Sequence, residues 1–351
     1  MKIKIIGCGL IGTSMALKFK EKGHKIWLSD VDKRNLALAQ DLIANSEAKP
    51  EIFDLIVIAT PTSEIVDILK SLKGFNKSST VIDIGGLKSK LLLEVEKFPE
   101  LAKIYVSTHP MSGREVMGPH SARSDLFEGR AWLVTPTAST RPENIDRAIE
   151  VGKILGASCY VLSAQEHDSI IAAISHAPQI LSSLMGALIA EEKSENLNFA
   201  GQGLRDVSRL AESDSKMWSE LLVGNRDQVV RKIKDSISFL TNLRDALDRE
   251  DANAVESFLR KGKEGRAKIP GKHGAIARAY SYLPIVINDK PGQLAKIFDE
   301  CAACGVNVED LSIEHSPNQE TGLITLALTQ SDAEKLKNHL QKKGWQAQEI
   351  R

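Results

Sequence analysis

A glycine-rich turn near the start of the chain constrains its fold more than any other feature. Gly7-Cys8-Gly9-Leu10-Ile11-Gly12 begins where the strand-like residues 2–7 end, and it opens a helical pattern over residues 11–22. In such a unit the first glycine permits a tight turn, the second lets a pyrophosphate approach the backbone, and the third lets the helix pack on the strand. The helix N-terminus offers unpaired N–H groups to the phosphates. The turn therefore predicts a nucleotide-binding βαβ unit.

Strands and helices continue to alternate over the first 135 or so residues, as a doubly wound sheet requires. Further strands are expected at 24–30, 55–60, 81–84, 105–108 and 132–135, and helices at 32–44 and 63–72. A helix over 145–155 and a last strand over 158–162 follow. Short apolar runs that alternate with helices of about 10–15 residues favour parallel βαβ units. We therefore predict an α/β fold with an N-terminal Rossmann-type doubly wound sheet.

The acid that ends the second strand bears on the choice of cofactor. Asp30 follows the glycine turn by about 20 residues, the separation at which an acid accepts hydrogen bonds from an adenosine ribose. Its charge would repel a 2′-phosphate, so NAD is favoured over NADP, although Lys33 and Arg34 lie close by and weaken the preference. We interpret Cys8 as a small filler rather than a reactive thiol. The expected cofactor contacts are Gly7, Gly9, Leu10, Ile11, Gly12, Asp30, Thr60, Pro61 and Gly86.

The rest of the chain divides into a helical part and a small module with strands. Helices are expected over 165–192, 203–212, 214–223 and 226–258, and the Gly-rich basic stretch 262–274 is typical of a linker. The last 70 residues give strands at 280–287, 306–314, 323–329 and 345–350, helices at 291–304 and 332–343, and a turn at 317–322. This is the split βαββαβ order of a ferredoxin-like module. A capping box at residues 331–334 would start its second helix.

These patterns predict the following domains: 1–164, nucleotide-binding; 165–262, all-helical; 263–278, linker; 279–351, small α+β.

Composition excludes several classes of protein. Lys+Arg 46 against Asp+Glu 46 leaves no net charge, which is unlike a nucleic-acid binder. No apolar run approaches the roughly 18–20 residues of a membrane-spanning helix, and no leader pattern precedes the first strand. Four cysteines suggest no disulfide framework, and Cys301 and Cys304 are expected to be buried small residues rather than metal ligands. We expect a cytoplasmic protein without metal, nucleic-acid or membrane partners.

Candidate polar residues gather in three segments. His109 follows the strand at 105–108, at the carboxyl edge of the predicted sheet, where ligands collect. His176 lies in Ser175-His176-Ala177-Pro178-Gln179. Arg205 and Arg209 are four apart on one helical face, and such a pair can bind carboxylates. For each of these residues a purely structural role stays open, and for Trp218 an ordinary core position does too.

Taken together, these segments closely resemble the prephenate/arogenate dehydrogenase family of tyrosine biosynthesis. The likeness is carried by the glycine turn, Asp30, Asp83-Ile84-Gly85-Gly86-Leu87-Lys88, THPMSGRE at 108–115, His167-Asp168 followed by SHAP, and GLRDVSRLAESDSKMW at 203–218. These motifs span residues 1 to about 225 in the family's order.

The resemblance implies that the helical domain 165–262 serves substrate binding and dimerisation, and it implies roles for matching residues. His109 would take the proton of the substrate's 4-hydroxyl while hydride passes to NAD, and Arg209, helped by Arg205, would bind a substrate carboxylate. Further substrate contacts are implied for Asp168, His176, Gln179, Trp218 and Glu115. Two positions depart from the family's pattern: Gly86 stands where many members have serine, and Gln179 where many have a second histidine. The second departure leaves the choice between prephenate and arogenate open.

The C-terminal module resembles an ACT domain, a fusion that occurs in this family. The resemblance implies feedback control by tyrosine at a paired-domain interface, within a homodimer; a module that only dimerises is the alternative. Pro291 suits a first helical position, and Gly292 would let a ligand approach the backbone. The implied effector contacts are Asn288, Asp289, Pro291, Gly292, Gln293 and Leu294.

Other functions remain as alternatives at this point. Within the family, arogenate or dual cyclohexadienyl specificity comes second to prephenate. A β-hydroxyacid dehydrogenase shares the nucleotide-plus-helical architecture, but it relies on a lysine in its helical domain and has no ACT module. A ligand-sensing protein with a vestigial nucleotide fold is the non-enzymatic alternative, and the presence of His109 with Arg205 and Arg209 speaks against it.

Overall fold

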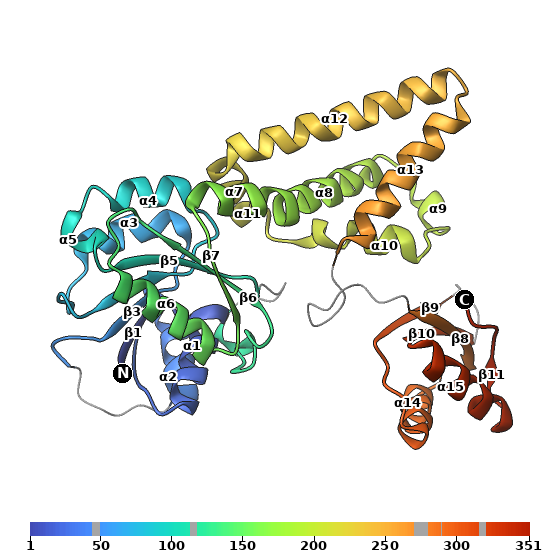
Figure 1. Ribbon diagram of the computed structural model, residues 1–351, viewed down its shortest axis with the longest axis horizontal. Coiled ribbons are helices and arrows are strands. Elements are labelled where there is room, and N and C mark those ends of the chain that lie inside the picture. Colours follow the sequence, from blue (N-terminus) through green and yellow to red (C-terminus); the bar gives the residue numbers. More distant parts are fainter. Residues whose placement is uncertain (44–49, 113–117, 270–279, 289, 316–320) are drawn as a thin grey trace. The chain divides into compact units, whose positions relative to one another are not determined.

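A seven-stranded sheet organises the N-terminal part of the computed structural model (Figure 1). The structure describes residues 1–43, 50–112, 118–269, 280–288, 290–315 and 321–351. The strand order is β2-β1-β3-β4-β5-β6-β7. In chain order the strands are β1 (Lys2–Ile6), β2 (Lys25–Ser29), β3 (Leu55–Ile58), β4 (Thr80–Asp83), β5 (Tyr105–Pro110), β6 (Ala131–Pro136) and β7 (Ser158–Val161).

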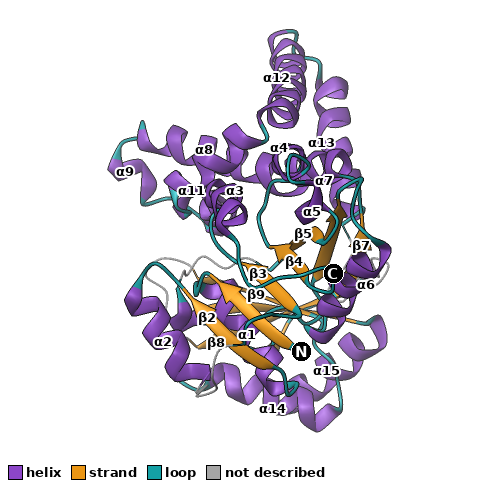
Figure 2. Cartoon of the chain, turned by 90° about the vertical axis from the view of Figure 1, so that its left-hand side faces the viewer, coloured by secondary structure: helices purple, strands orange, loops and turns teal. Residues whose placement is uncertain are grey.

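Helices cover both faces of this sheet (Figures 1 and 2). One apolar core joins β1, β3 and β6 to α1, α2 and α6, and Trp132 and Phe19 are fully buried in it. A second core joins the opposite face to α3, α4 and α5. The helices are α1 (Leu10–Glu21), α2 (Lys33–Ile43), α3 (Thr62–Ser71), α4 (Ser89–Val95), α5 (Pro99–Ala102) and α6 (Pro142–Ile154), with a short 3-10 turn η1 (Pro119–Ser121). The predicted α/β, Rossmann-like sheet is confirmed, while α4 and α5 are additional to the sequence prediction.

The sheet is not parallel throughout, which corrects one part of the prediction. Strand β6 pairs with β5 antiparallel, from Val106 opposite Pro136 to Pro110 opposite Trp132, whereas the other neighbours are parallel. A parallel pair needs a crossover that returns the chain to the same edge, usually through a helix. Among the described residues between β5 and β6 only the 3-10 turn η1 is helical, and the chain returns in the opposite direction.

The helical segment that follows β7 begins with one long helix. α7 (Ala164–Ile171), a π-helical stretch η2 (Ala172–His176) and α8 (Ala177–Ala190) run on without a break. By length and composition the run Ala164–Ala190 would suffice to cross a membrane, at a mean hydropathy of 1.3, which corrects the expectation that no such run exists. Core helices of soluble proteins pass the same test, and this one carries His167, Asp168 and His176.

The next helices differ from the prediction in their limits. They are α9 (Ser194–Leu197), α10 (Gln202–Ser208), the 3-10 turn η3 (Arg209–Glu212), α11 (Ser215–Gly224), α12 (Arg226–Asp248) and α13 (Ala252–Ala267). The single helix predicted over 226–258 is wrong because Glu250 takes a left-handed conformation, with φ 55°, and the Asp251 side chain accepts from the backbone N–H of Ala254 to start a new helix. The new helix continues to Ala267, so the linker predicted from residue 263 begins inside a helix.

The C-terminal module has the predicted element order. It consists of β8 (Ser281–Asn288), α14 (Gln293–Cys304), β9 (Asp310–His315), β10 (Thr321–Leu328), α15 (Gln330–Lys342) and β11 (Gln346–Ala347). Its antiparallel sheet has the order β11-β8-β10-β9, and its own core unites both helices with the sheet. Cys301 is buried in that core with Cys304 packed against it, as expected of small apolar residues.

Two helix starts in this module correct the sequence prediction. α15 begins at Gln330, because the hydroxyl of Thr329 accepts from the N–H of Asp332, so the capping box expected at residues 331–334 is not used. α14 begins at Gln293, and Gly292 precedes it in a left-handed conformation with φ 85°. Pro291 is therefore not the first helical residue, and the glycine is needed for the turn.

Contacts divide the chain into two compact units. One comprises residues 1–187 with 210–238, and the other comprises 188–209 with 239–351. The site described next lies in the first unit.

Candidate active site

The glycine turn has the geometry of a phosphate cradle. Gly7 has φ 102°, and a Cβ there would lie 2.4 Å from the carbonyl oxygen of Ala59. A Cβ on Gly12 would lie 2.1 Å from the oxygen of Gly7. At Gly9, by contrast, a Cβ would meet nothing within 4 Å, and the helix that starts at Leu10 has no side-chain cap. Two glycines thus pack the turn, and the third leaves open space before a helix N-terminus, which suits an anion.

Asp30 braces the same turn. Its Oδ2 accepts from the backbone N–H of Cys8 at 2.5 Å, and its Oδ1 accepts from the N–H of Asp32 at 2.7 Å. Arg34, a residue that weakens the sequence preference for NAD, lies with its Nη2 3.2 Å from Oδ2 of Asp32. Burial, followed by the charge of Asp30, raises the pKa of Cys8 to about 12, so this thiol stays protonated and inert.

A cavity of about 810 Å³ lies beyond the carboxyl ends of the strands. Four of the predicted cofactor contacts line it: Ile11, Thr60, Pro61 and Gly86. Three of the predicted catalytic and substrate residues line it too: His109, His176 and Trp218. Its wall is mostly apolar, with Lys90, Glu94 and Glu220 as the charged members. A volume of this size suits a nicotinamide together with a small substrate.

Two buried hydroxyls on the cavity wall have no partner within the described part of the chain. These are Oγ1 of Thr60, just after β3, and Oγ of Ser112, just after β5. Buried polar atoms are nearly always hydrogen-bonded. The two hydroxyls can therefore take part in hydrogen bonds with a polar ligand in the cavity.

His109 stands at the end of β5 and is joined to a chain of polar side chains. Its Nδ1 lies 2.9 Å from Nε2 of His167, and Nδ1 of His167 lies 2.9 Å from Oδ1 of Asp168. Asp168 also accepts from the backbone N–H groups of Lys88, at 3.1 Å, and Ser89, at 2.8 Å, at the start of α4. A carboxylate that receives these N–H groups acts as an acceptor and caps the helix.

The hydrogen bonds from Asp168 through His167 to His109 fix the tautomer of each ring. Because the carboxylate of Asp168 accepts, Nδ1 of His167 carries the proton and its Nε2 offers a lone pair. Nδ1 of His109 must then donate to that lone pair, which leaves Nε2 of His109 unprotonated. A Cβ on cavity-lining Gly86 would lie 3.9 Å from this Nε2, so the lone pair lies at the cavity wall. The arrangement presents a neutral base to the cavity.

Burial keeps the three histidines neutral. Desolvation, then the charge of Lys88, holds the pKa of His109 well below its usual 6.5. Desolvation likewise lowers the pKa of His167 and of His176. For Asp168, burial acts to raise the pKa, but hydrogen bonds from His167 and Ser89 outweigh it and hold the pKa below its usual range. The base is thus neutral and its supporting carboxylate ionised.

His176 is the second histidine on the cavity. Its ring is buried and packs edge-on to Trp218, with centroids 6.0 Å apart. The amide Nδ2 of Asn225 lies 3.3 Å from Nδ1 of His176 and donates to the carbonyl of Asp168 at 2.8 Å. Since that amide can only donate, Nε2 of His176 carries the ring proton. Nε2 of His176 is therefore a hydrogen-bond donor.

The structure gives two predicted substrate residues other surroundings. The carboxylate of Asp168 is engaged by His167 and the start of α4, so it supports the base instead of contacting a ligand. Gln179 is buried, and its Nε2 donates to the carbonyl of Leu210 at 2.8 Å. Neither residue lines the cavity.

The remaining predicted residues are two arginines, Glu115 and the residues of the turn before α14. Arg205 lies in α10 and Arg209 follows at the start of η3, and both are exposed. Glu115 and Asp289 lie outside the described residues. Around Asp289, Asn288, Pro291, Gly292 and Leu294 are exposed and Gln293 is half-buried at the turn before α14.

The departure at Gly86 can be judged from the space around it. A Cβ there would lie 3.3 Å from Cδ2 of Leu221 and 3.8 Å from Cε1 of His109. A serine hydroxyl would fit with a small shift of Leu221 and would reach the ring. His167 binds the other ring nitrogen of His109, Nδ1, so it does not replace such a hydroxyl.

Two residues of the site carry no signal of their own in the sequence. His167 and Lys88 stand in segments that the resemblance uses, yet nothing in their spacing assigns them a role. His167 is a helix residue whose partner lies 58 positions earlier. Such a contact is set by the packing of α7 against the sheet, which no local pattern encodes.

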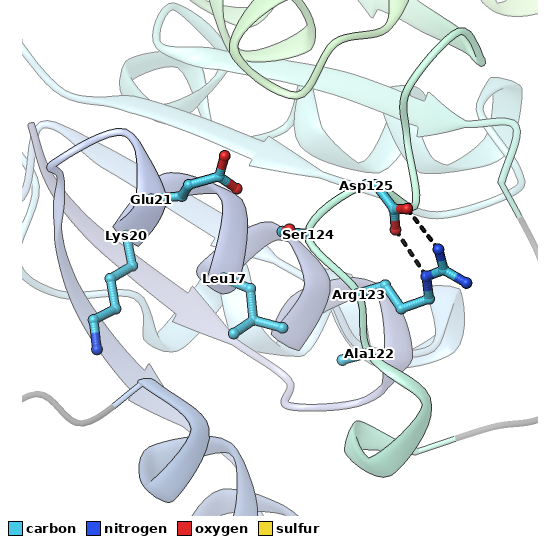
Figure 3. Close-up of a pocket in the computed structure, with 7 residues that line it drawn as sticks. All are labelled: Leu17, Lys20, Glu21, Ala122, Arg123, Ser124 and Asp125. Carbon is cyan, nitrogen blue, oxygen red and sulfur yellow. Dashed lines mark hydrogen bonds and ion pairs between the residues drawn. The ribbon is translucent and has the colours of Figure 1, made fainter.

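A second hollow on the same unit lies between α1 and the segment after η1 (Figure 3). There Arg123 faces Asp125 and pairs with it through Nε at 2.8 Å and Nη2 at 2.6 Å. The guanidinium of Arg123 and the carboxylate of Asp125 therefore satisfy each other.

Comparisons with known proteins identify relatives of this chain. Residues 15–161 match the family model for the prephenate dehydrogenase nucleotide-binding domain, and residues 163–261 match the model for its dimerization domain. The chain is 31% identical to a probable prephenate dehydrogenase, NovF, of Streptomyces niveus, over 98% of both chains. It is 26% identical to the prephenate dehydrogenase of Bacillus subtilis over 95% of this chain and 93% of that one.

The solved structure of a relative has a similar fold. The prephenate dehydrogenase of A. aeolicus, solved with hydroxyphenyl propionate and NAD+, superposes with a TM-score of 0.69 at 27% identity. The match covers 76% of this chain and 97% of that one. The nucleotide cradle, the histidine at the cavity and these matches lead to one conclusion: the chain belongs to the prephenate dehydrogenase family.

Proposed function

We propose that the protein catalyses the NAD-dependent oxidative decarboxylation of prephenate to 4-hydroxyphenylpyruvate. The observation that carries the proposal is the Asp168–His167–His109 chain, which ends in an unprotonated Nε2 at the cavity. A base so placed can take a hydroxyl proton from a ligand. The relatives named prephenate dehydrogenase supply the substrate class.

The residues of the cradle fit NAD. The open space at Gly9 and the uncapped start of α1 would receive the pyrophosphate, and Asp30 would receive the adenosine ribose. The hydroxyl of Thr60, which has no partner among the described residues, lies on the cavity where the nicotinamide end would reach. NAD supplies the hydride acceptor when it is bound. Asp30, whose charge would repel a 2′-phosphate, favours NAD over NADP.

The reaction requires one base and a correct position of the substrate relative to the nicotinamide. Hydride leaves C4 of prephenate while Nε2 of His109 takes the proton of the 4-hydroxyl. The C1–carboxylate bond then breaks, CO2 leaves, and its electron pair makes the ring aromatic. The resulting phenolate takes the proton back from His109, so the base is regenerated. Aromatisation makes the reaction effectively irreversible, and the neutral state of His109 is what the first step requires.

Cations must meet the two carboxylates of prephenate, because the chain has no net charge. We assign this role to Arg209, with Arg205 as a second cation, since two exposed guanidiniums one helical turn apart can each bind a carboxylate. Trp218 and His176 form the cavity wall, and Nε2 of His176 is available to donate. Glu115 keeps the polar supporting role that the resemblance implies.

Arogenate is the second candidate substrate, and one observation favours it. The Nε2 of Gln179 is held by the carbonyl of Leu210, which fixes the amide orientation, and Oε1 is buried without a partner among the described residues. The alanyl ammonium of arogenate would donate to such an acceptor, whereas the keto group of prephenate would not. Gln179 does not line the cavity, so we place prephenate first.

We propose that the chain has three functional parts, although its contacts divide it into two compact units. The family models separate a nucleotide part from a helical part near residue 162, close to the predicted boundary at 164. α12 carries a stripe of exposed apolar side chains at helical spacing, which supports a homodimer: Val230, Ile233, Ile237, Leu240 and Leu247. The C-terminal module has the βαββαβ order and strand order expected of a ferredoxin-like ACT domain, and we assign it feedback control by tyrosine at the turn 288–294.

A direct assay tests the proposed activity. Purified protein is given prephenate or arogenate, each with NAD or NADP, with and without tyrosine, and NADH formation and CO2 release are followed. We expect equal amounts of NADH and CO2 with prephenate and NAD, and less with NADP. Turnover of arogenate alone would transfer the proposal to that substrate, and no reduction with either would reject it.

A further inference from the structure

Lys88 is the largest charged side chain that the structure buries completely. It follows β4 and Gly86, directly before α4. Its ammonium has three acceptors: Oδ2 of Asp83 at 3.0 Å, the carbonyl of Gly85 at 2.6 Å and the carbonyl of Thr108 at 2.8 Å. An ammonium has three N–H donors, whereas a neutral amine has two and would leave one buried acceptor unmatched. The geometry therefore selects the charged form.

Asp83, the counter-ion, is held by further donors. Its Oδ1 accepts from the hydroxyl of Tyr105 at 2.7 Å and from the hydroxyl of Ser107 at 2.5 Å, and its Oδ2 accepts from the N–H of Gly85 at 2.7 Å. Every donor in this group comes from β5 or from the segment after β4. The ion pair is thus fixed in place beneath the loop that carries Gly86.

Lys88 contacts both supports of His109. Its side chain binds the carbonyl of Thr108, the residue that precedes His109 on β5. Its backbone N–H binds Oδ1 of Asp168, the carboxylate at the far end of the histidine chain. One residue therefore ties the strand that carries the base to the group that orients the base.

We propose that Lys88 is a positioning residue for the reaction: its buried charge and its two links hold the imidazole of His109 in place and keep it uncharged. The inference rests on the proposed function, in which His109 is the base. Desolvation lowers the pKa of Lys88 itself, and the charge of Asp83 opposes that effect. Desolvation is the largest cause of the low pKa of His109, and the charge of Lys88 is the second largest.

Other groups also face His109, and the test must allow for them. His167 and Asp168 approach it from α7, and His176 approaches from η2. Lys90 and Glu94 on α4 and Glu220 on α11 line the same cavity. Besides desolvation, Lys88, His167 and His176 lower the pKa of His109 and Asp168 raises it, so removing Lys88 removes the largest charge contribution that holds this pKa down.

The test compares the wild type with Lys88→Met and with the double variant Asp83→Asn/Lys88→Met. The double variant removes both members of the ion pair, so no unpaired carboxylate stays buried. It therefore serves as the test protein if the single variant does not fold. Two quantities are measured: the pH profile of kcat/KM for prephenate, and the NMR titration of the His109 ring in the protein without ligands. His109→Asn identifies the ring signal.

We expect the acid limb of the profile and the ring titration to move together to higher pH. The shift should be about one unit for Lys88→Met and smaller for the double variant, which has also lost the acidic partner. A fall in kcat at every pH with an unmoved limb and an unmoved titration would overturn the proposal and leave Lys88 structural. If His109→Asn retained turnover, the proposed function would fail, while the ring titration would still decide whether Lys88 acts on His109.

Discussion

His109 and His167 meet ring to ring, with Nδ1 of the first 2.9 Å from Nε2 of the second and the ring centroids 5.2 Å apart. Because Asp168 fixes the proton of His167 on the opposite side of the ring, the contact also fixes which nitrogen of His109 faces the cavity. The geometry is that of an orienting carboxylate acting through an intermediate ring. It makes the reactivity of one strand residue depend on the packing of a helix.

Replacing the base should abolish turnover and spare the cofactor. His109→Ala removes the acceptor of the 4-hydroxyl proton, so kcat should fall by about 10²–10⁴-fold. The affinity for NAD, measured by fluorescence titration, should stay the same because the cradle lies at the turn between β1 and α1 and at Asp30 after β2. His120→Ala, at an exposed histidine in η1, is the matched control and should behave as the wild type. Wild-type kcat in His109→Ala would refute the assignment.

Replacing Asp168, which orients His167, should also reduce turnover. In Asp168→Asn an amide replaces a carboxylate that receives N–H groups from His167, Lys88 and Ser89, so one donor must lose its partner. If the NH2 group turns to His167, both rings are driven into the wrong tautomer. We expect kcat to fall by roughly 10²-fold or more, with a small change in KM.

The matched control for that variant lies on the same helix. Glu166→Gln changes an exposed residue of the helix-capping box and should leave kcat unchanged. An Asp168→Asn protein as active as this control would show that the orientation of His167 does not matter.

Stability should decrease as the pH falls below 6.5. Burial holds the pKa values of His109, His167 and His176 below the value of 6.5 that they take when unfolded. Below pH 6.5 the unfolded chain therefore binds protons that the folded chain does not, and the free energy of unfolding drops. Urea midpoints between pH 8 and 5 measure the effect. His176→Gln should show a shallower decrease, and a steeper or equal one would contradict the explanation.

Two glycines of the cradle should respond differently to alanine. Gly12→Ala places a methyl against the carbonyl of Gly7, so it should destabilise the protein by about 1–3 kcal/mol. Gly9→Ala adds a methyl into open space, so its thermal midpoint should match the wild type. Its NAD affinity should nevertheless fall at least tenfold, because the pyrophosphate needs that space. Unchanged NAD affinity in Gly9→Ala would place the phosphates elsewhere.

Removing the C-terminal module should remove tyrosine control. Residues 283–347 contain a core of their own, so deletion of 280–351 leaves the two cores of the N-terminal sheet intact. We expect prephenate turnover to persist and inhibition by tyrosine to vanish. Gly292→Ala, which strains a turn with φ 85°, should raise the half-inhibitory tyrosine concentration. Inhibition that survives the deletion would show that tyrosine acts at another site.

The sequence by itself determined the features that depend on local patterns. The glycine turn, the alternation of strands and helices, Asp30, and the position of His109 at a strand end all follow from near neighbours along the chain. Where local signals compete, the sequence prediction failed: Glu250 and Asp251 break a helix that the apolar spacing would continue, and Thr329 starts α15 ahead of a well-formed capping box.

Tertiary structure decided which polar groups meet. His167 reaches His109 across 58 positions, and Lys88 binds the carbonyl of Thr108 across 20. Both contacts depend on how α4 and α7 pack on the sheet, and the free energy of that packing comes from apolar surface spread over many residues. The same packing excludes water, which keeps the histidines neutral and a lysine paired in the interior. No spacing along the chain reports desolvation, so the state of the base could be known only once the chain was folded.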